Sequence, residues 1–173
     1  MVYYILENGG LGCFAFENKN KTRGSVSLIH EEISAAHDAF KAMDVRELNP
    51  LQMAYVGDTV HDLYVRSMLL SRGMSVGKMH RQAVRMVSAG AQAKMLAAIE
   101  PELSETEADI ARRGRNSQAK HAAPKHADPA DYAHATGLEA LWGYLYLSGQ
   151  PKRLDELIKL ALARTEELWQ KRT

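Results

Sequence analysis

The sequence predicts an all-α fold: a compact bundle of about six to eight helices that follows an irregular N-terminal extension. Apolar residues recur at intervals of three and four from residue 31 onward, which is the period of a helix. No alternation of useful length, as a strand would show, appears after residue 30. Glycine, proline and capping residues separate the periodic segments, so the helices are distinct.

Length and composition fit one ordinary globular domain. The chain has 173 residues, of which 46% are hydrophobic and 25% charged, and this mixture excludes disordered and collagen-like classes. The single cysteine, Cys13, cannot form an internal disulfide. The N-terminus has neither a basic region nor a long apolar run, so we expect a cytoplasmic protein without a signal peptide or a membrane span.

Residues 1–30 are rich in glycine and polar side chains and lack helical periodicity. We expect them to form a peripheral extension, either disordered or folded as a short hairpin in which YYIL pairs with CFAF. Residues 31–173 are then the single helical domain.

The first helices of this domain are expected over residues 31–43 and 48–71. In the second of these, Asn49 is a suitable cap and Pro50 a suitable first-turn residue, and Gly73 ends the helix. Ser75 can cap a further helix over residues 75–87. A break near residues 88–90 separates it from an alanine-rich helix that ends at Pro101.

The second half of the domain begins with a capping box, Ser104 followed by Glu107, which opens a helix that fades into RRGRN. The next segment, SQAKHAAPKHADP, has prolines and no periodicity, so we expect an exposed loop. Apolar periodicity returns after Asp131 and again after Pro151, which predicts the last two helices.

Two acidic residues lie in apolar helical surroundings. In AYVGDTVHDLYVR, Asp58 borders the apolar stripe and follows Gly57, and in GLEALWGYLYL, Glu139 precedes Gly143 by one turn. Glycine costs roughly 1 kcal/mol in a helix, so close approach of a second helix would explain it. Carboxylates removed from water are protonated, paired or metal-bound, and with oxygen ligands alone Mg²⁺ is the natural cation. The alternative is that both acids are solvated at the edge of the stripe.

The net charge of +1 does not indicate a partner, but the charge is unevenly distributed. Residues 75–99 and 112–126 contain no acid and several lysines and arginines. On a helix, Lys78, Arg81 and Arg85 lie along one face. Such stretches are either solvated surface or a site for a polyanion.

At these residues the chain resembles a known family. AYVGDTVHDLYVR resembles the signature helix of ribonuclease III, and GLEALWGYLYLSG resembles its second acidic helix. Four blocks in order, LNPLQMAYVGDTVHDLYVR, MVSAGAQAK, RRGRN and T-x-x-E-A-L-W-G-Y, are similar to Mini-ribonuclease III, the branch without a double-stranded RNA-binding domain. The resemblance covers about residues 46–165.

The chain departs from the wider ribonuclease III pattern at three acidic positions. Leu51 and Ala54 stand where that family has acids before the signature aspartate, and Thr136 stands where it has an aspartate before the glutamate. Asp58 and Glu139 are the acids that remain, which leaves open the number of metal ions and the other ligands. Asp62 and Thr136 are candidates for a supporting role around the site.

The resemblance implies the ribonuclease III endonuclease-domain helical bundle and a Mg²⁺-dependent endoribonuclease that leaves 5′-phosphate and 3′-hydroxyl ends. Asp58 and Glu139 would be the catalytic residues and the metal ligands. It also implies a homodimer whose interface includes Ala54, Tyr55 and Gly57. The substrate would be double-stranded RNA, with maturation of large-subunit (23S) ribosomal RNA precursor as the cellular task.

In this interpretation the basic stretches contact the RNA duplex, whose phosphates and 2′-hydroxyls are its accessible features. The candidate RNA-binding residues are Arg112, Arg113, Arg115, Asn116, Lys120, Lys125, Lys78, Arg81 and Arg85. The alternative from another class is a non-catalytic helical RNA-binding or ribosome-assembly module on the same fold. Divalent-metal binding that depends on Asp58 would separate the two.

Overall fold

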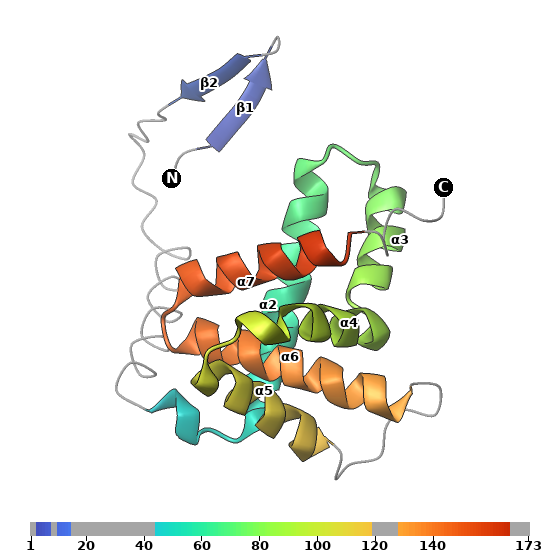
Figure 1. Ribbon diagram of the computed structural model, residues 1–173. Coiled ribbons are helices and arrows are strands. Elements are labelled where there is room, and N and C mark those ends of the chain that lie inside the picture. The colour runs from blue at the N-terminus through green and yellow to red at the C-terminus, as the bar shows by residue number, and fades with distance from the viewer. Residues whose placement is uncertain (1–2, 8–9, 15–43, 119–127, 167–173) are drawn as a thin grey trace, which may run out of the picture. The chain divides into compact units, whose positions relative to one another are not determined.

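The computed structural model describes residues 3–7, 10–14, 44–118 and 128–166 (Figure 1). The chain divides into two units, Met1–Ala36 and His37–Thr173. The helix expected over residues 31–43 lies outside the described residues, as do Lys120 and Lys125.

The first unit contains a hairpin. Strand β1, Tyr3–Glu7, pairs antiparallel with strand β2, Gly10–Phe14, so that Tyr3 lies opposite Phe14 and Glu7 opposite Gly10. The second strand therefore begins at Gly10 rather than at Cys13, where the sequence pattern placed it. An isolated two-stranded hairpin is only marginally stable in water.

Every described element of the second unit is a helix, which confirms the all-α fold. In chain order these elements are η1 Val45–Glu47, α2 Pro50–Ser71, α3 Val76–Met86, α4 Ala89–Ile99, η2 Glu100–Glu102, α5 Glu105–Gln118, α6 Pro129–Leu147 and α7 Pro151–Arg164.

The expected caps explain where several helices begin and end. The Asn49 side chain accepts from Leu51 N at 2.9 Å, and the Gln52 side chain accepts from Asn49 N at 3.2 Å, which together form a capping box for α2. Gly73, with φ of 65°, follows the end of α2. Ser104 and Glu107 form the predicted capping box of α5, with bonds of 2.8 and 3.3 Å.

Helices α5 and α6 are longer than the sequence predicted. The RRGRN segment is helical, since α5 continues to Gln118, and α6 begins at Pro129 with Asp128 as its cap. Packing explains the extension of α5, because a Cβ on Gly114 would lie 2.7 Å from Ala140 Cβ on α6. Tertiary contact of this kind stabilises a helical turn whose composition is otherwise unfavourable.

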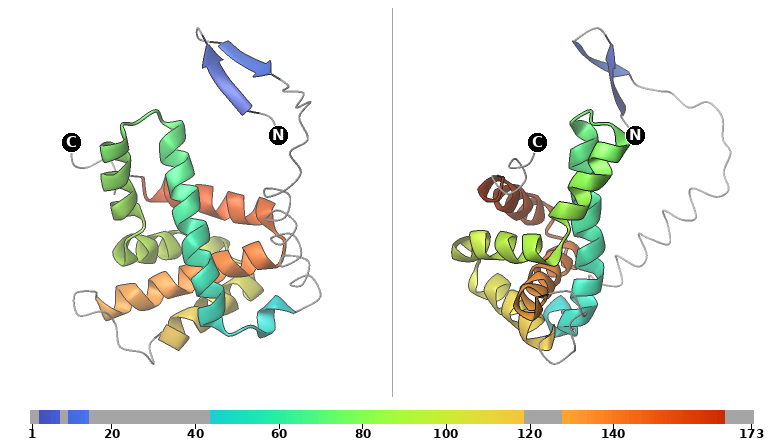
Figure 2. Two further views of the ribbon diagram at one scale, coloured as in Figure 1. Left: turned by 180° about the vertical axis from the view of Figure 1, so that it is seen from behind. Right: turned by 90° about the vertical axis from the view of Figure 1, so that its right-hand side faces the viewer.

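Helix α6 lies at the centre of the second unit, and contacts α2, α4, α5 and α7 (Figure 1). Its apolar residues Leu138, Leu141, Trp142 and Leu145 are fully buried in the main core. The side view in Figure 2 shows α2 along one side of the bundle, opposite α4, α5 and α7. Within the residues described, no helix is long and apolar enough to cross a membrane.

Candidate active site

Helices α2 and α6 approach each other at a pair of glycines. A Cβ on Gly57 would lie 1.8 Å from the carbonyl oxygen of Glu139, and a Cβ on Gly143 would lie 1.9 Å from that of Met53. No side chain fits at either position, so the two backbones are in direct contact. The close approach that the sequence suggested as the reason for Gly57 is therefore present, and it lies within one chain.

This crossing brings Asp58 and Glu139 into one electrostatic environment. Asp58 is exposed on α2, and Glu139 is partly buried on α6. The pKa of Glu139 is raised from 4.5 to about 7, first because burial disfavours the charged carboxylate and second because of the negative charge of Asp58. A hydrogen bond from Gln92 opposes this rise in pKa and is the weakest of the three influences.

Two buried polar residues behind the acids were not among the sequence candidates. Gln92 on α4 is 2% exposed and His61 on α2 is 1% exposed. Burial lowers the pKa of His61, whose Nε2 lies 3.3 Å from Met86 O. The sequence could have pointed to Gln92, since apart from Lys94 it is the one polar residue in an alanine-rich helix.

The donor set at the crossing suits a hard divalent cation. The Asp58 carboxylate lies close enough to Glu139 for its charge to raise the pKa of Glu139. A cation between the two carboxylates would offset their repulsion. Mg²⁺ is commonly held by one or two carboxylates, with water and substrate phosphate oxygens in the remaining positions. Among the described residues no group of three or more His, Cys, Asp or Glu could hold a metal ion, so Asp58 and Glu139 would act as a pair.

The two supporting candidates are both engaged locally. Asp62 accepts a hydrogen bond from Arg66 Nε at 2.7 Å on the same helix. Thr136 is 4% exposed, and its hydroxyl donates to Tyr132 O at 3.1 Å. Both hydrogen bonds lie within a single helix, and a supporting role for Asp62 or Thr136 around the site stays a prediction.

The dimer prediction requires a correction at two of its three residues. Ala54 is 5% exposed and packs in a core cluster with Ile110, Ala140 and Leu147 of the same chain. Gly57 is buried against α6. Because intrachain packing covers both residues, they cannot form a surface for a second copy. Tyr55 is 82% exposed and remains available.

The basic residues separate into two groups. Lys78, Arg81 and Arg85 are all exposed on α3, and we call them the α3 basic face. On α5, Arg113 is not a free cation, because its guanidinium donates to Arg46 O at 2.7 Å and to Leu48 O at 3.2 Å. These bonds hold the segment before α2 in place, and the part of Arg113 in RNA binding stays a prediction.

The remaining α5 candidates face solvent at least in part. Arg112 is exposed and pairs with Asp109 one turn earlier, Arg115 is partly buried, and Asn116 is exposed. The segment that carries them is a helix, so these side chains have fixed spacing and do not belong to an irregular loop.

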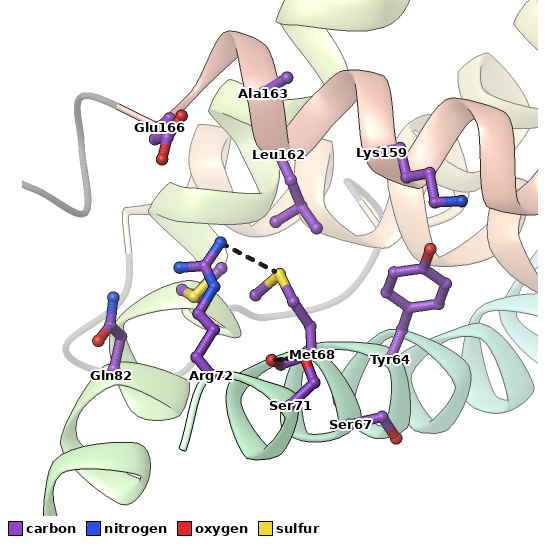
Figure 3. A pocket seen from close by; sticks show the side chains of 11 residues that line it. Tyr64, Ser67, Met68, Ser71, Arg72, Gln82, Lys159, Leu162, Ala163 and Glu166 are labelled. Atoms are coloured by element: carbon purple, nitrogen blue, oxygen red, sulfur yellow. Dashed lines mark hydrogen bonds between the residues drawn. The ribbon is translucent and has the colours of Figure 1, made fainter. Parts of the chain in front are cut away.

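A cavity of about 590 Å³ lies away from the acids, between α2, α3 and α7 (Figure 3). Tyr64, Met68 and Arg72 line it from the side of α2, and Lys159 and Leu162 line it from α7. The Arg72 guanidinium contacts Met68 Sδ at 3.7 Å. Neither Asp58 nor Glu139 lines this cavity, so it is separate from the acidic crossing.

Comparison with known proteins shows which family the chain belongs to. The family model described as the Ribonuclease III domain matches residues 51–150, which include the whole α2–α6 crossing. The chain is similar to Mini-ribonuclease 3 of Symbiobacterium thermophilum, with 52% identity over 115 residues that cover 66% of this chain and 88% of that protein. It is also similar to Mini-ribonuclease 3 of Enterococcus faecalis, with 41% identity over 127 residues that cover 72% and 96%.

A solved structure shares the fold. The crystal structure of a protein from Fusobacterium nucleatum superposes with a TM-score of 0.63 at 25% identity, covering 69% of this chain and 96% of that one. The matched family and the named relatives support an enzyme over a non-catalytic module. The chain belongs to the Mini-ribonuclease III branch of the ribonuclease III family and is a ribonuclease.

Proposed function

We propose that this ribonuclease is a Mg²⁺-dependent endonuclease that cleaves double-stranded regions of structured RNA, with Asp58 and Glu139 as its metal ligands. The observation that carries the proposal is the crossing of α2 and α6. It brings two acids from distant parts of the sequence together and lets the charge of one raise the pKa of the other.

The two carboxylates would perform their role through fixed position and charge. Mg²⁺ bound there would polarise the scissile phosphate and lower the pKa of a bound water. The glycine contact holds the helix backbones that carry Asp58 and Glu139, so little reorganisation is needed when the cation binds. Mg²⁺ in proteins is commonly held by one or two carboxylates together with water and substrate phosphate, so Asp58 and Glu139 would suffice as its protein ligands. The products would carry 5′-phosphate and 3′-hydroxyl ends.

The α3 basic face supports duplex binding. An RNA duplex presents phosphates and 2′-hydroxyls, so a protein without a separate RNA-binding domain needs cations on the catalytic domain itself. All three side chains of the α3 basic face are exposed. Arg112, Arg113, Arg115 and Asn116 on α5 are further candidates, and Arg113 also donates to two backbone carbonyls. Lys120 and Lys125 remain part of the proposal from the sequence alone.

A homodimer is also part of the proposal. Tyr55, Leu63 and Leu70 on α2 are 82%, 66% and 67% exposed. Their spacing of about two helical turns puts them on one face, and exposed apolar stripes of this kind mark interaction surfaces. A second copy packing there would bury this stripe while the glycine crossing stays within each chain. The double substitution Leu63→Ala and Leu70→Ala should shift the protein toward monomer in analytical ultracentrifugation.

The cellular role that we propose is maturation of large-subunit (23S) ribosomal RNA precursor in the cytoplasm. Its support is the resemblance to Mini-ribonuclease III and the similarity to proteins of that name. The single cysteine suits a reducing compartment.

The test uses a labelled RNA duplex and its two separate strands, each with Mg²⁺ or with EDTA. Wild-type protein should cut the duplex in Mg²⁺ only, and Asp58→Asn should bind the duplex without cutting it. The matched control is Glu156→Gln, which removes an exposed acid on α7 that pairs with Arg153. Wild-type turnover by Asp58→Asn would refute the mechanism. A wild-type protein that binds the duplex in Mg²⁺ and never cuts it would instead be the non-catalytic module.

A further inference from the structure

We propose that residues 167–173 dock into the cavity between α2, α3 and α7 through Leu168 and Trp169, and complete the packing beneath α3. These residues have the sequence ELWQKRT and lie outside the described residues. The cavity has a volume of about 590 Å³ (Figure 3). Neither Asp58 nor Glu139 lines it, so docking there is independent of the metal centre.

The wall of the cavity is one side of a small hydrophobic core. Met86 is 1% exposed and belongs to the core cluster of α2 and α3, and Met68 and Leu162 are partly buried against the same cluster. All three side chains also line the cavity. The core beneath α3 is therefore open on the side of α7. Burial of apolar surface stabilises a folded protein in proportion to its area, so this wall favours an apolar occupant.

The chain supplies such an occupant at the edge of the cavity. Leu162 and Ala163 of α7 line the cavity, and so does Glu166, the last described residue (Figure 3). Trp169 follows three residues later, and three residues of extended chain span at most about 11 Å. The indole ring of Trp169 can therefore enter the cavity without a rearrangement of α7.

The size and the charge of the cavity suit this segment. Pockets of roughly 300–1,000 Å³ hold drug-sized molecules, so the cavity has room for the Trp169 ring and the Leu168 side chain. The Arg72 guanidinium lies at the cavity, where it contacts Met68 Sδ at 3.7 Å. Arginine binds the faces of aromatic rings, and Glu167 supplies an acid that can pair with it. The segment is thus complementary to the cavity in both apolar area and charge.

Docking would fix α3, the helix that carries the α3 basic face. Helix α3 packs on α2 and α4, and Leu162 of α7 packs against its core cluster. An indole in the cavity would join α2, α3 and α7 and so restrict the movement of α3. The consequence for RNA rests on the proposed function: Trp169→Ala should weaken duplex binding, because the cations of the α3 basic face are then held less firmly.

Tryptophan fluorescence of the full chain tests the docking without RNA. The chain has two tryptophans, and Trp142 is fully buried in the core. The difference between the spectra of wild type and Trp169→Phe therefore isolates the emission of Trp169. In the cavity, Trp169 should emit at shorter wavelength than N-acetyltryptophanamide in water, and acrylamide should quench it less.

A ring placed in the cavity from α7 should displace the segment. In Ala163→Phe, the emission and the quenching of Trp169 should become those of the free amide in water. The matched control is Ala97→Phe, which changes an exposed alanine of α4 outside the cavity and should leave both measurements unchanged. Trp169→Ala should lower the melting temperature by at least about 6 °C, whereas its neighbour Gln170→Ala should not.

Four results would overturn the proposal. In the first, Trp169 of wild type already emits and is quenched like the free amide. In the second, Trp169 is shielded but Ala163→Phe does not expose it. In the third, the shielding is lost on dilution, so that the ring lies against a second copy of the chain. In the fourth, Trp169 is exposed and wild type binds the dye 8-anilinonaphthalene-1-sulfonate until Ala163→Phe is introduced, which would assign the cavity to a small apolar anion. A protein that never binds duplex would contradict the proposed function and leave these fluorescence results intact.

Discussion

Replacement of Glu139 by glutamine should change how the stability of the metal-free protein depends on pH. The pKa of Glu139 is about 7 in the folded protein, against 4.5 ordinarily, and burial is the larger cause. Between these two pH values the folded state holds a proton that the unfolded chain has lost. The free energy of unfolding therefore falls as pH rises through this window, and the loss is complete above pH 7.

The magnitude follows from the difference between the two pKa values. Each tenfold change in proton affinity corresponds to about 1.4 kcal/mol, so the full penalty at pH 8 is at most about 3 kcal/mol. Partial exposure of Glu139 reduces this value through solvent screening. Glu139→Gln cannot ionise, so relative to wild type it should gain stability between pH 4 and pH 8. For a chain of this size the gain corresponds to roughly 5–10 °C in melting temperature.

The assay is thermal or urea unfolding of both proteins at several pH values, in EDTA. Other acids, such as Glu107, are common to both proteins, so their contributions cancel in the difference. If the free energies of unfolding of the two proteins differ by the same amount at pH 4 and at pH 8, the reasoning is refuted. Glu139 would then have the same pKa in the folded and the unfolded state. Addition of Mg²⁺ should stabilise wild type at pH 8 and leave Glu139→Gln nearly unaffected.

Three further predictions follow from particular contacts. Gly57→Ala should lower the free energy of unfolding, measured in urea, by more than about 3 kcal/mol, because the new Cβ would lie 1.8 Å from Glu139 O. This loss should outweigh the better helix propensity of alanine. Unchanged stability would mean that α2 and α6 separate easily. Arg153→Met should lower the free energy of unfolding by about 3 kcal/mol at pH 7, because it leaves the buried carboxylate of Glu107, 5% exposed, without the partner that donates to it at 2.8 and 3.0 Å. Arg153 is also the chief reason that the pKa of Glu107 is lowered, so the stabilising charge of Glu107 is lost as pH falls and the cost should be smaller at pH 4. Equal costs at both pH values would contradict this. Alanine at all three positions of the α3 basic face should weaken RNA duplex binding, measured by fluorescence anisotropy. The slope of log affinity against log salt concentration should also become shallower, by about one phosphate contact for each residue that touches the RNA. An unchanged slope would exclude this face from RNA binding.

The sequence by itself determined where most of the described helices begin and the pairing of acids with glycines. Periodicity, the Asn49 cap and the box of Ser104 and Glu107 are local features, set by residues within one or two turns of each other, and the structure has them as predicted. The pattern of a glycine beside each acid predicted a helix crossing, which Gly57 and Gly143 form. The family, too, could be identified from the order of short motifs.

Only the tertiary structure decided which surfaces are free and which side chains are engaged. Ala54 and Gly57 lie on a helix face that looks available in sequence, yet α6 of the same chain covers them. Arg113 lies in a basic segment that looks like a surface for RNA, but its guanidinium donates to carbonyls more than sixty positions away. Local spacing cannot encode such contacts, because they depend on how distant helices cross.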